Sequence, residues 1–515
     1  MGSKKILRVA VFILLLAWSG LFFVHKIDLT TADLGRHLAN GRLVFAGQLD
    51  VLKTNFYSYP EPDFPTVNHH WGAGVIFYLI EKTFGFAGLS LFYLILSLFI
   101  FGLFFKIAEK EAGFWTSAIV SLLYIPLMAA RTEIRPEIFS ELFIALFFWI
   151  LWRWRREEIS GRWLFVLPAI ELVWANVHIY FIFGLAFIGL FLFEEIIQPS
   201  LRKIARFKTL GLVLALSLLA SLATPFFASG LLEPFRIFEN YGYRIIENQS
   251  VWFLENLGFI ANPNLKLFEI GLAVLILSFA LLLFKKKKPN LVFLILAVIF
   301  STLGWLAIRN FTLFGLFALP IVACNLRHIF NSKVFRNLTA KTGLIFLSLA
   351  VFGLTFLTQF DRLPFGGQSF GWGLSDGNHQ SAEFFKEAGL KGPVFNNYDI
   401  GGYLIYELFP SERVFVDNRP EAYSIDFFQR RYIPMQQDNS VWQREDAQEQ
   451  FNAIFFSHRD ATPWGQNFLI ERLKDDIWAP VYVDQYAIIF LKKNELNREL
   501  IEQYGIPKES FFAAR

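Results

Sequence analysis

Apolar runs of about 18 to 22 residues recur between residues 6 and 360 of this 515-residue chain, and they limit its fold more than any other feature. Each run is long enough to cross the roughly 30 Å apolar core of a bilayer as a helix. Only 18% of the residues are charged, whereas soluble domains carry about 25%. We therefore predict a polytopic α-helical membrane protein with about eleven transmembrane helices, at residues 6–25, 87–105, 112–130, 137–152, 163–176, 178–197, 209–226, 267–284, 290–308, 311–326 and 342–360.

The distribution of lysine and arginine between these runs predicts the orientation. Alternate connections, beginning with the N-terminus, hold 21 basic residues in short segments, and the longer remaining connections hold 11. Because cytoplasmic loops are enriched in basic residues, the first set is predicted to be cytoplasmic. Residues 6–25 are interpreted as a retained first span, since no small-residue cleavage site follows them. The chain is predicted to cross the cell inner or plasma membrane many times, with a cytoplasmic N-terminus.

This topology gives a transmembrane domain at residues 1–360, with a first exterior loop at 26–86, and an exterior tail at 361–515. In the tail, strand-length apolar runs alternate with segments of helical spacing, which favours an extracytoplasmic α/β domain with a mostly parallel sheet. The tail sequence contains neither a dinucleotide-binding glycine motif nor a P-loop, so no nucleotide is predicted. The predicted strands are 391–399, 412–418, 451–458, 478–484 and 486–493, and the predicted helices are 381–390, 401–409, 444–451 and 467–475.

The first exterior loop has the spacing of two helices that lie at the membrane surface. Residues 33–47 place apolar side chains at helical intervals with polar residues between them, and residues 68–85 begin a second, partly embedded helix. A turn-rich segment separates the two. Such a platform over the membrane suits a substrate that is linked to a lipid.

Several short motifs follow one another along the chain: D-x-x-x-H-L-x-x-G at 33–41, N-x-Y-S-Y-P at 55–60, H-H-W at 69–71, R-x-E-I-R-P-E-I-F-S at 131–140, W-A-N-V-H at 174–178, R-N at 309–310, N-x-Y-D-I-G-G-Y-L at 396–404 and V-F-V-D-N-R at 414–419. Their order resembles GT-C-type membrane glycosyltransferases, and most closely the bacterial dolichyl-phosphate-mannose-protein mannosyltransferase-like branch. The resemblance implies inverting transfer of a hexosyl or pentosyl group from a polyprenyl-phosphate donor on the non-cytoplasmic face, in cell-envelope glycan biosynthesis. It also implies an acidic residue of the first exterior loop as general base, and no cofactor.

Asp33 occupies the position of that base. A carboxylate there would take the acceptor's proton as the anomeric bond breaks. The alternative is a helix N-cap, since aspartate suits the start of the surface helix, and Asp28 is the competing carboxylate. The sequence departs from the family pattern at Leu34 and Gly35, where aromatic residues often follow the acid, and at His70, where an acidic residue often precedes tryptophan.

Arginine residues at the exterior ends of the spans are predicted to bind the donor phosphate. A phosphate leaving group gathers negative charge, and a planar guanidinium can donate two hydrogen bonds to it. Arg131, Arg135 and Arg309 are the candidates, and Glu137 is predicted to line the same site. The alternative is ordinary extension of the arginine side chains to the lipid headgroups.

Several histidine and buried polar residues are further candidates for lining the site. His37 and His70 could orient the base, but with His69 they match no standard metal motif, so no metal site is predicted, although a divalent ion stays possible. Glu171, Asn176 and His178 lie at predicted membrane depth and could line a cavity or clamp neighbouring helices.

Two more segments carry polar residues with open roles. Residues 233–255 hold four acidic residues and several aromatic ones, and they suit either a wall or lid of the site or a pair of surface helices. Residues 396–403 and 417–419 suit ligand binding at strand ends or, more simply, turn chemistry.

Three functions fit the sequence. The first is a glycosyltransferase with a polyprenyl-phosphate sugar donor and a lipid, glycan or protein acceptor, surrounded by membrane lipids and binding no nucleic acid. The second is a transporter of lipid-linked sugars, which would need more polar residues deep in the spans. The third is a non-catalytic scaffold with the same fold.

Overall fold

The computed structural model describes residues 2–31, 33–197, 204–236, 239–258, 262–330, 343, 345, 348–349, 351, 353 and 369–511. The chain forms two compact units. The helical unit comprises residues 1–26, 87–234 and 245–373, and the loop–tail unit comprises residues 27–86, 235–244 and 374–515. The first exterior loop of the sequence and the tail therefore fold together as one unit.

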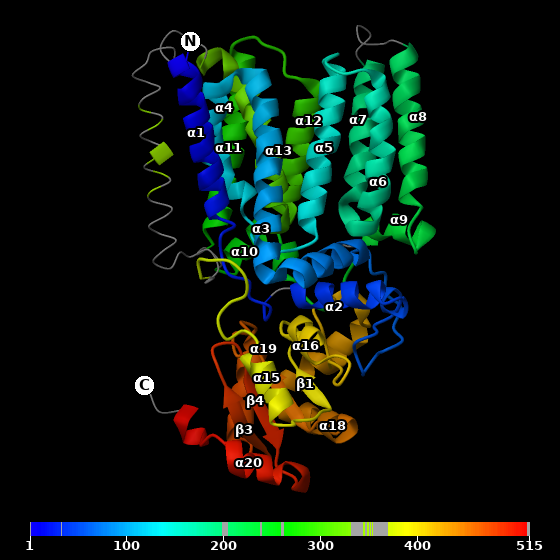
Figure 1. Cartoon of the computed structure of the whole chain (residues 1–515), viewed down its shortest axis with the longest axis vertical. Helices are drawn as coiled ribbons and strands as arrows, with labels where there is room; N and C mark the ends of the chain where they lie inside the picture. The colour runs from blue at the N-terminus through cyan, green and yellow to red at the C-terminus, as the bar shows by residue number, and fades with distance from the viewer. Residues whose placement is uncertain are drawn as a thin grey trace. The chain divides into compact units, whose positions relative to one another are not determined.

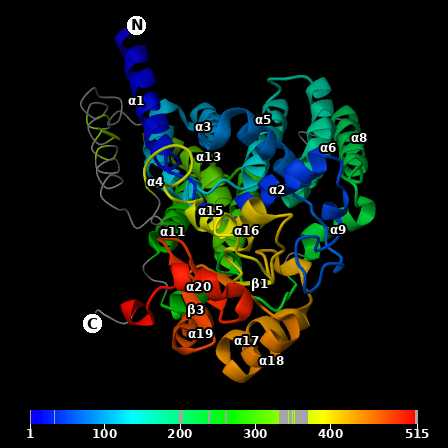
Figure 2. The ribbon, with the colours of Figure 1, turned by 60° about the horizontal axis from the view of Figure 1, so that its bottom comes forward.

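In the helical unit, long apolar helices run side by side (Figures 1 and 2). Within the described residues, ten of the predicted spans coincide with a helix, and the eleventh, at 342–360, lies largely outside them. Five of the described helices are both long and apolar enough to cross a membrane. The number of about eleven spans stays a prediction. The helices are α1 (Gly2–Leu21), α3 (Trp71–Ala112), α4 (Phe114–Met128), α5 (Glu137–Arg155), α6 (Val166–Val177), α7 (Ile182–Ile197), α8 (Ile204–Ser221), α9 (Phe227–Arg236), α10 (Val251–Asn256), α11 (Pro263–Phe284), α12 (Leu291–Leu306) and α13 (Phe311–Phe330).

Local chemistry sets the ends of these helices. Gly113 has φ 84° and separates α3 from α4, a conformation that glycine adopts without steric cost. Pro136 precedes α5 with φ −58°, which suits the start of a helix. The side chains of Asn262 and Asn290 cap α11 and α12 by accepting backbone N–H bonds. These signals fix where each apolar run begins.

The interior of the helical unit is filled by phenylalanine rings. Phe300 and Phe317 stack with ring centroids 4.2 Å apart, and Phe187 and Phe148 lie against Phe317 at 5.7 and 5.2 Å. These rings come from α5, α7, α12 and α13, so they hold four helices around one centre. Such contacts supply van der Waals packing, which holds helices together where lipid is the solvent.

The loop–tail unit contains a four-stranded sheet within residues 369–511, with the strand order β1-β2-β4-β3. β1 pairs with β2 in parallel, whereas β2 with β4 and β3 with β4 are antiparallel. The predicted mostly parallel sheet is therefore wrong. The physical reason is a tight turn, because the Asp484 carboxylate accepts hydrogen bonds from the N–H groups of Tyr486 and Ala487 and turns β3 back beside β4. The strands are β1 (Val394–Asn396), β2 (Ala453–Phe456), β3 (Trp478–Val483) and β4 (Ile488–Lys492).

Residues 412–418, predicted as a strand, are not part of this sheet. Val414 exchanges backbone hydrogen bonds with the first loop instead, from its N–H to the Tyr57 carbonyl and from the Tyr59 N–H to its own carbonyl. The four predicted helices of the tail are confirmed, as α15 (Gln380–Glu387), α16 (Gly401–Leu408), α18 (Asn439–Glu449) and α19 (Pro463–Lys474). Two further helices, α17 (Pro434–Gln437) and α20 (Arg498–Tyr504), were not predicted.

Two helices of the first loop belong to this unit. α2 (Leu34–Phe45) confirms the helix predicted at 33–47, and the second predicted helix forms the start of α3, which breaks at Gly85 with φ 65°. Glycines allow α2 to approach its neighbours closely. A Cβ on Gly35 would lie 2.6 Å from the Gly402 carbonyl oxygen of α16, and one on Gly41 would lie 2.0 Å from the Gly74 carbonyl oxygen of α3.

The core of the loop–tail unit is aromatic. Phe395 of β1 is fully buried and packs against Trp442 and Phe468, whose ring centroids lie 5.1 Å away. Trp478 of β3 lies on the far side of Trp442, at 5.9 Å. The sheet and the helices α18 and α19 therefore share one core (Figure 1).

Candidate active site

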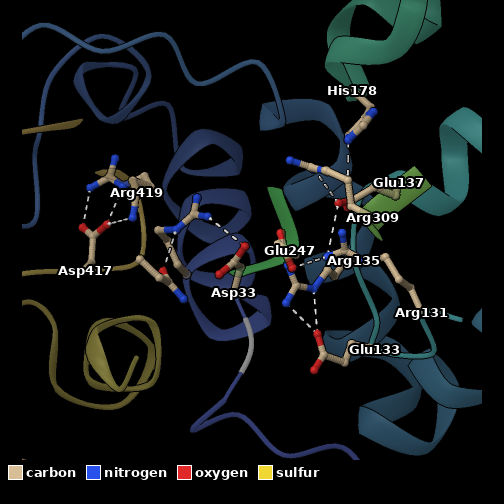
Figure 3. A network of polar contacts seen from close by, with 12 residues as sticks. Asp33, Arg131, Glu133, Arg135, Glu137, His178, Glu247, Arg309, Asp417 and Arg419 are labelled. Carbon is tan, nitrogen blue, oxygen red and sulfur yellow. Dashed lines mark hydrogen bonds and ion pairs between the residues drawn. The ribbon is translucent and has the colours of Figure 1, made fainter. Parts of the chain in front are cut away.

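The polar residues predicted to act in the site form two groups, one in each unit, and Figure 3 draws members of both. We name the first the arginine cluster, which lies in the helical unit. The second surrounds Asp33 in the loop–tail unit. The members of the arginine cluster are Arg131, Arg135, Arg309, Glu133, Glu137 and Glu247.

In the arginine cluster, two carboxylates connect the three guanidinium groups. Glu247 accepts from Arg131 Nη2 at 2.8 Å and lies 3.3 Å from Arg135 Nη1. Glu137 accepts from Arg309 Nη2 at 3.0 Å and lies 3.7 Å from Arg131. The third carboxylate binds Arg135 from the same loop. The sequence motif at 131–140 thus forms one network with Arg309, which is distant in sequence.

The fold brings these residues together from chain segments that end at the same side of the helical unit. Arg131 and Arg135 lie on the connection between α4 and α5, and Glu137 is the first residue of α5. Glu247 lies on the one-turn helix η4 (Ile246–Asn248), and Arg309 lies on η6 (Ile308–Asn310). The two short helices are joined by the Ile308 N–H, which donates to the Gln249 carbonyl.

The cluster has formal charges that cancel, because three arginines face three glutamates. The neighbouring guanidinium groups of Arg131 and Arg135 lower the pKa of Glu247 to about 2, against the effect of its burial. Glu247 is therefore ionised at neutral pH. Its ion pairs stabilise the fold above its ordinary pKa and are lost as the pH falls towards 2.

His178, which the sequence analysis gives as a candidate lining residue, lies beside the same cluster. Its Nδ1 lies 2.7 Å from Ser140 Oγ and accepts from the Tyr180 N–H. Ser140 in turn accepts from Trp174 Nε1 at 2.7 Å. Because Nδ1 accepts the hydrogen bond from the Tyr180 N–H, we assign the ring proton to Nε2. Nε2 lies 3.9 Å from the Glu137 carboxylate. The histidine therefore points its donor at the cluster (Figure 3).

Glu171 and Asn176 have partners of another kind. Glu171 is fully buried on α6, and its Oε1 accepts from Ser221 Oγ of α8 at 2.9 Å. Asn176 donates to the Leu172 and Ala223 carbonyls. These contacts are the helix clamps that the sequence left as the alternative to a cavity lining.

Asp33 lies at the start of α2 and does not cap it. Its backbone is helical, with φ −73° and ψ −3°, and its side chain makes no capping hydrogen bond. The carboxylate lies 3.8 Å from Arg36 Nη2 and is about one quarter exposed. Arg36 also donates to Asn418 of the tail at 3.4 Å. The carboxylate that the sequence marked as a base is therefore accessible.

The competing carboxylate, Asp28, is held in the structure of the unit. Its Oδ1 accepts from the backbone and the hydroxyl of Thr30 and from Asn378, and its Oδ2 accepts from Arg459 at 2.8 Å. Through Asn378 and Arg459, the Asp28 carboxylate connects the first loop to the tail. Because it already accepts four hydrogen bonds, it has little capacity left to take a proton from a substrate.

Asp399 is a further acidic residue near Asp33. Burial, together with the negative charges of Asp460 and Asp33, raises the pKa of Asp399 to about 7. Tyr243 stacks on the neighbouring Tyr398 with ring centroids 4.2 Å apart. Only folding reveals the proximity of Asp399 to Asp33, because the two lie 366 positions apart in the chain.

The histidines of the first loop pack together in this unit. The ring centroids of His37 and His70 are 5.4 Å apart, and those of His69 and His70 are 4.0 Å apart. Among the described residues, no group of three His, Cys, Asp or Glu side chains is arranged to hold a metal ion.

The tail motif at 417–419 holds the first loop. Arg419 Nη2 lies 2.6 Å from Asp417 Oδ2 and donates to Asn55 at 3.0 Å. Both members of the ion pair are buried. The Asp417 side chain also accepts from the Arg419 N–H, as in the turn that the sequence favoured for this motif. The bond from Arg419 to Asn55 adds a contact with the first loop.

Comparison with known proteins identifies the fold. No family model matches the sequence, and none of the curated proteins does. Solved structures do match, among them the oligosaccharyltransferase AglB of the archaeon Archaeoglobus fulgidus in complex with an inhibitory peptide and a dolichol-phosphate. For that complex the TM-score is 0.62 and the identity 10%, over 96% of this chain and 75% of that one.

Two further structures of the Archaeoglobus fulgidus oligosaccharyltransferase are similar. One is a complex with zinc and sulfate, with a TM-score of 0.56 and 10% identity over 94% of this chain and 73% of that one. The other is tethered to an acceptor peptide containing the NVT sequon, with a TM-score of 0.59 and 10% identity over 95% and 74%. The protein therefore shares its fold with the Archaeoglobus fulgidus oligosaccharyltransferase.

Proposed function

We propose that this protein is a membrane glycosyltransferase. It transfers a hexosyl or pentosyl group from a polyprenyl-phosphate donor to a lipid, glycan or protein acceptor on the non-cytoplasmic face, and it inverts the anomeric centre. The observation that carries the proposal is the arginine cluster, on a fold shared with oligosaccharyltransferases. Three guanidinium groups held at one end of an apolar helical unit suit a lipid phosphate.

In the proposed reaction, the acceptor oxygen attacks the anomeric carbon from the face opposite the phosphate. The bond from that carbon to the phosphate oxygen breaks, and the electron pair leaves with the lipid phosphate. Asp33 takes the proton of the acceptor, and Arg131, Arg135 and Arg309 stabilise the charge that develops on the phosphate. Asp33 is favoured over Asp28 because its carboxylate is accessible and does not cap the helix.

The acceptor class is the most open part of the proposal. Two of the similar solved structures carry a peptide, one inhibitory and one with a sequon. A peptide acceptor is therefore tested beside lipid and glycan acceptors. The relation to the bacterial mannosyltransferase-like branch rests on the sequence motifs and belongs to this proposal.

The test uses the full chain in nanodiscs with radiolabelled polyprenyl-phosphate sugars and the three acceptor classes. Asp33→Asn is expected to lower turnover by about 10²- to 10⁴-fold, the usual contribution of a general base. Asp63→Asn removes an exposed carboxylate from the same loop and is the matched control, with unchanged turnover expected. Equal turnover of wild type and Asp33→Asn would remove Asp33 from the mechanism. A wild type that binds the donor and transfers to no acceptor would favour the scaffold.

A further inference from the structure

The Glu247 side chain occupies the centre of the arginine cluster. Its carboxylate lies 2.8 Å from Arg131 Nη2 and 3.3 Å from Arg135 Nη1, so it bridges two guanidinium groups of one loop. A phosphate oxygen pair uses the same planar donors and the same spacing. The carboxylate and a donor phosphate would therefore compete for these two arginines.

The cluster also has hydrogen-bond donors to spare. Arg131 Nη1 and Arg309 Nε are buried and make no hydrogen bond within the described part of the chain. Buried donors without an acceptor cost free energy. A phosphodiester has two non-bridging oxygens, as a carboxylate does, and two ester oxygens besides, so it can accept from donors that Glu247 leaves unsatisfied.

Among the carboxylates that face two arginines, Glu247 is the one that can leave. Glu137 is 15% exposed, is the first residue of the long helix α5 and contacts Arg309, Arg131 and His178. Glu247 is 27% exposed and lies on a single helical turn. The backbone beside it is held independently, since the Gln249 carbonyl accepts from the Ile308 N–H at 3.2 Å, and the Asn248 side chain accepts from Arg309 Nη1 at 3.0 Å. The side chain can therefore move while its helical turn stays in place.

We propose that Glu247 is a displaceable placeholder for the donor phosphate. In the unliganded protein its carboxylate neutralises Arg131 and Arg135, and the incoming phosphodiester takes its position. This inference rests on the proposed function. The Glu247 carboxylate and a phosphodiester each carry one negative charge, so their exchange keeps the cluster neutral. A sugar linked to a lipid monophosphate therefore suits the cluster better than a sugar linked to a lipid diphosphate, which carries two negative charges.

The test measures lipid binding without an acceptor, so that no transfer is needed. The full chain in phosphatidylcholine nanodiscs is titrated with a short-chain polyprenyl-phosphate glucose and with the corresponding polyprenyl-diphosphate glucose. Glu247→Gln removes the competing charge, and we expect it to bind the monophosphate about tenfold more tightly than wild type. Glu255→Gln is the matched control, because that carboxylate of the next helix is 27% exposed, as Glu247 is, and pairs with Lys266 at 2.7 Å. Its affinity is expected to equal that of wild type.

Thermal melting separates a placeholder from a purely structural ion pair. Glu247→Gln should melt at a lower temperature than wild type without lipid, because two partly buried arginines lose a charged partner. The monophosphate lipid should then raise its melting temperature by more than it raises that of wild type. If the glutamine variant does not fold, Glu247→Asp replaces it, because aspartate keeps the charge on a shorter side chain. Glu247→Asp should bind the monophosphate lipid more tightly than wild type does.

Unchanged or weaker monophosphate binding by Glu247→Gln would overturn the placeholder role, and so would equal tightening in Glu255→Gln. Sugar transfer by wild type with no tightening in Glu247→Gln would overturn this inference alone. Tighter lipid binding by Glu247→Gln together with no transfer by wild type would support the placeholder and overturn the proposed function.

Discussion

At the residue scale, the carboxylates of the loop–tail unit have different surroundings and therefore different uses. Asp28 accepts four hydrogen bonds, whereas Asp33 is partly exposed beside Arg36. Asp399 is held in its protonated form up to about pH 7 by burial and by two neighbouring negative charges. Within one unit, a carboxyl group is thus a structural hydrogen-bond acceptor in Asp28, a candidate base in Asp33 and a protonated acid in Asp399.

Asp399 should make the stability of the loop–tail unit depend on pH. Its pKa is raised from 3.8 to about 7 in the folded protein. The contribution of the protonated carboxyl to the free energy of unfolding is therefore fully present below pH 3.8 and is lost as the pH rises through 7. Asp399→Asn should therefore be more stable than wild type at pH 8.5, by roughly 2 kcal/mol after allowance for its partial exposure, and equally stable at pH 4. Thermal melting at both pH values checks this. Asp476→Asn, an exposed tail carboxylate, should show no such difference.

Asp417 should be needed to hold the first loop. It pairs with Arg419, which also binds Asn55, and both charged groups are buried. Asp417→Asn leaves a buried guanidinium without a counter-charge, at a cost of about 3–5 kcal/mol. Hydrogen exchange should accelerate at residues 53–59 and 414–419. Unchanged protection there would show that the ion pair does not hold the loop.

At the element scale, glycines determine where α2 lies. The residue after Leu34 departs from the family pattern, and the structure gives a reason, because a side chain on Gly35 would meet the Gly402 carbonyl of α16. Gly41 makes the same kind of contact with Gly74 of α3. The close packing of three helices thus replaces the aromatic side chains expected after the acid.

Substitution of Gly41 should separate these helices. A Cβ there would lie 2.0 Å from a backbone oxygen, which cannot move aside as a side chain can. Gly41→Ala should destabilise the loop–tail unit by about 1–3 kcal/mol, the usual cost of overpacking. Gly189→Ala on α7 is the control, since its Cβ would meet open space. Equal melting temperatures of the two variants would contradict a steric role for Gly41.

At the scale of the whole molecule, the proposed function assigns parts of one reaction to the two units. The candidate base belongs to the loop–tail unit and the arginine cluster to the helical unit. If both act in one transition state, the effects of removing them should not add. This gives a test that needs no knowledge of the acceptor's binding mode.

A double-mutant cycle checks that expectation. Arg131→Gln should lower kcat by about 10²- to 10³-fold, as for other groups that stabilise charge in the transition state. Combined with Asp33→Asn, the loss should be smaller than the product of the two single losses. Donor binding, measured separately, should weaken in Arg131→Gln and stay unchanged in Asp33→Asn. Independent, multiplicative losses in kcat would argue against a shared step.

The sequence determined the long apolar helices and the helix that begins after Asp33, because hydrophobic periodicity and capping residues act over a few neighbouring residues. Ten predicted spans coincide with helices for this reason. Only the tertiary structure decided that β3 and β4 pair antiparallel, that Val414 bonds to the first loop, and that Glu247 bridges Arg131 and Arg135. These contacts join segments far apart in the chain, and no local pattern encodes which distant partner will satisfy a given backbone group or charge.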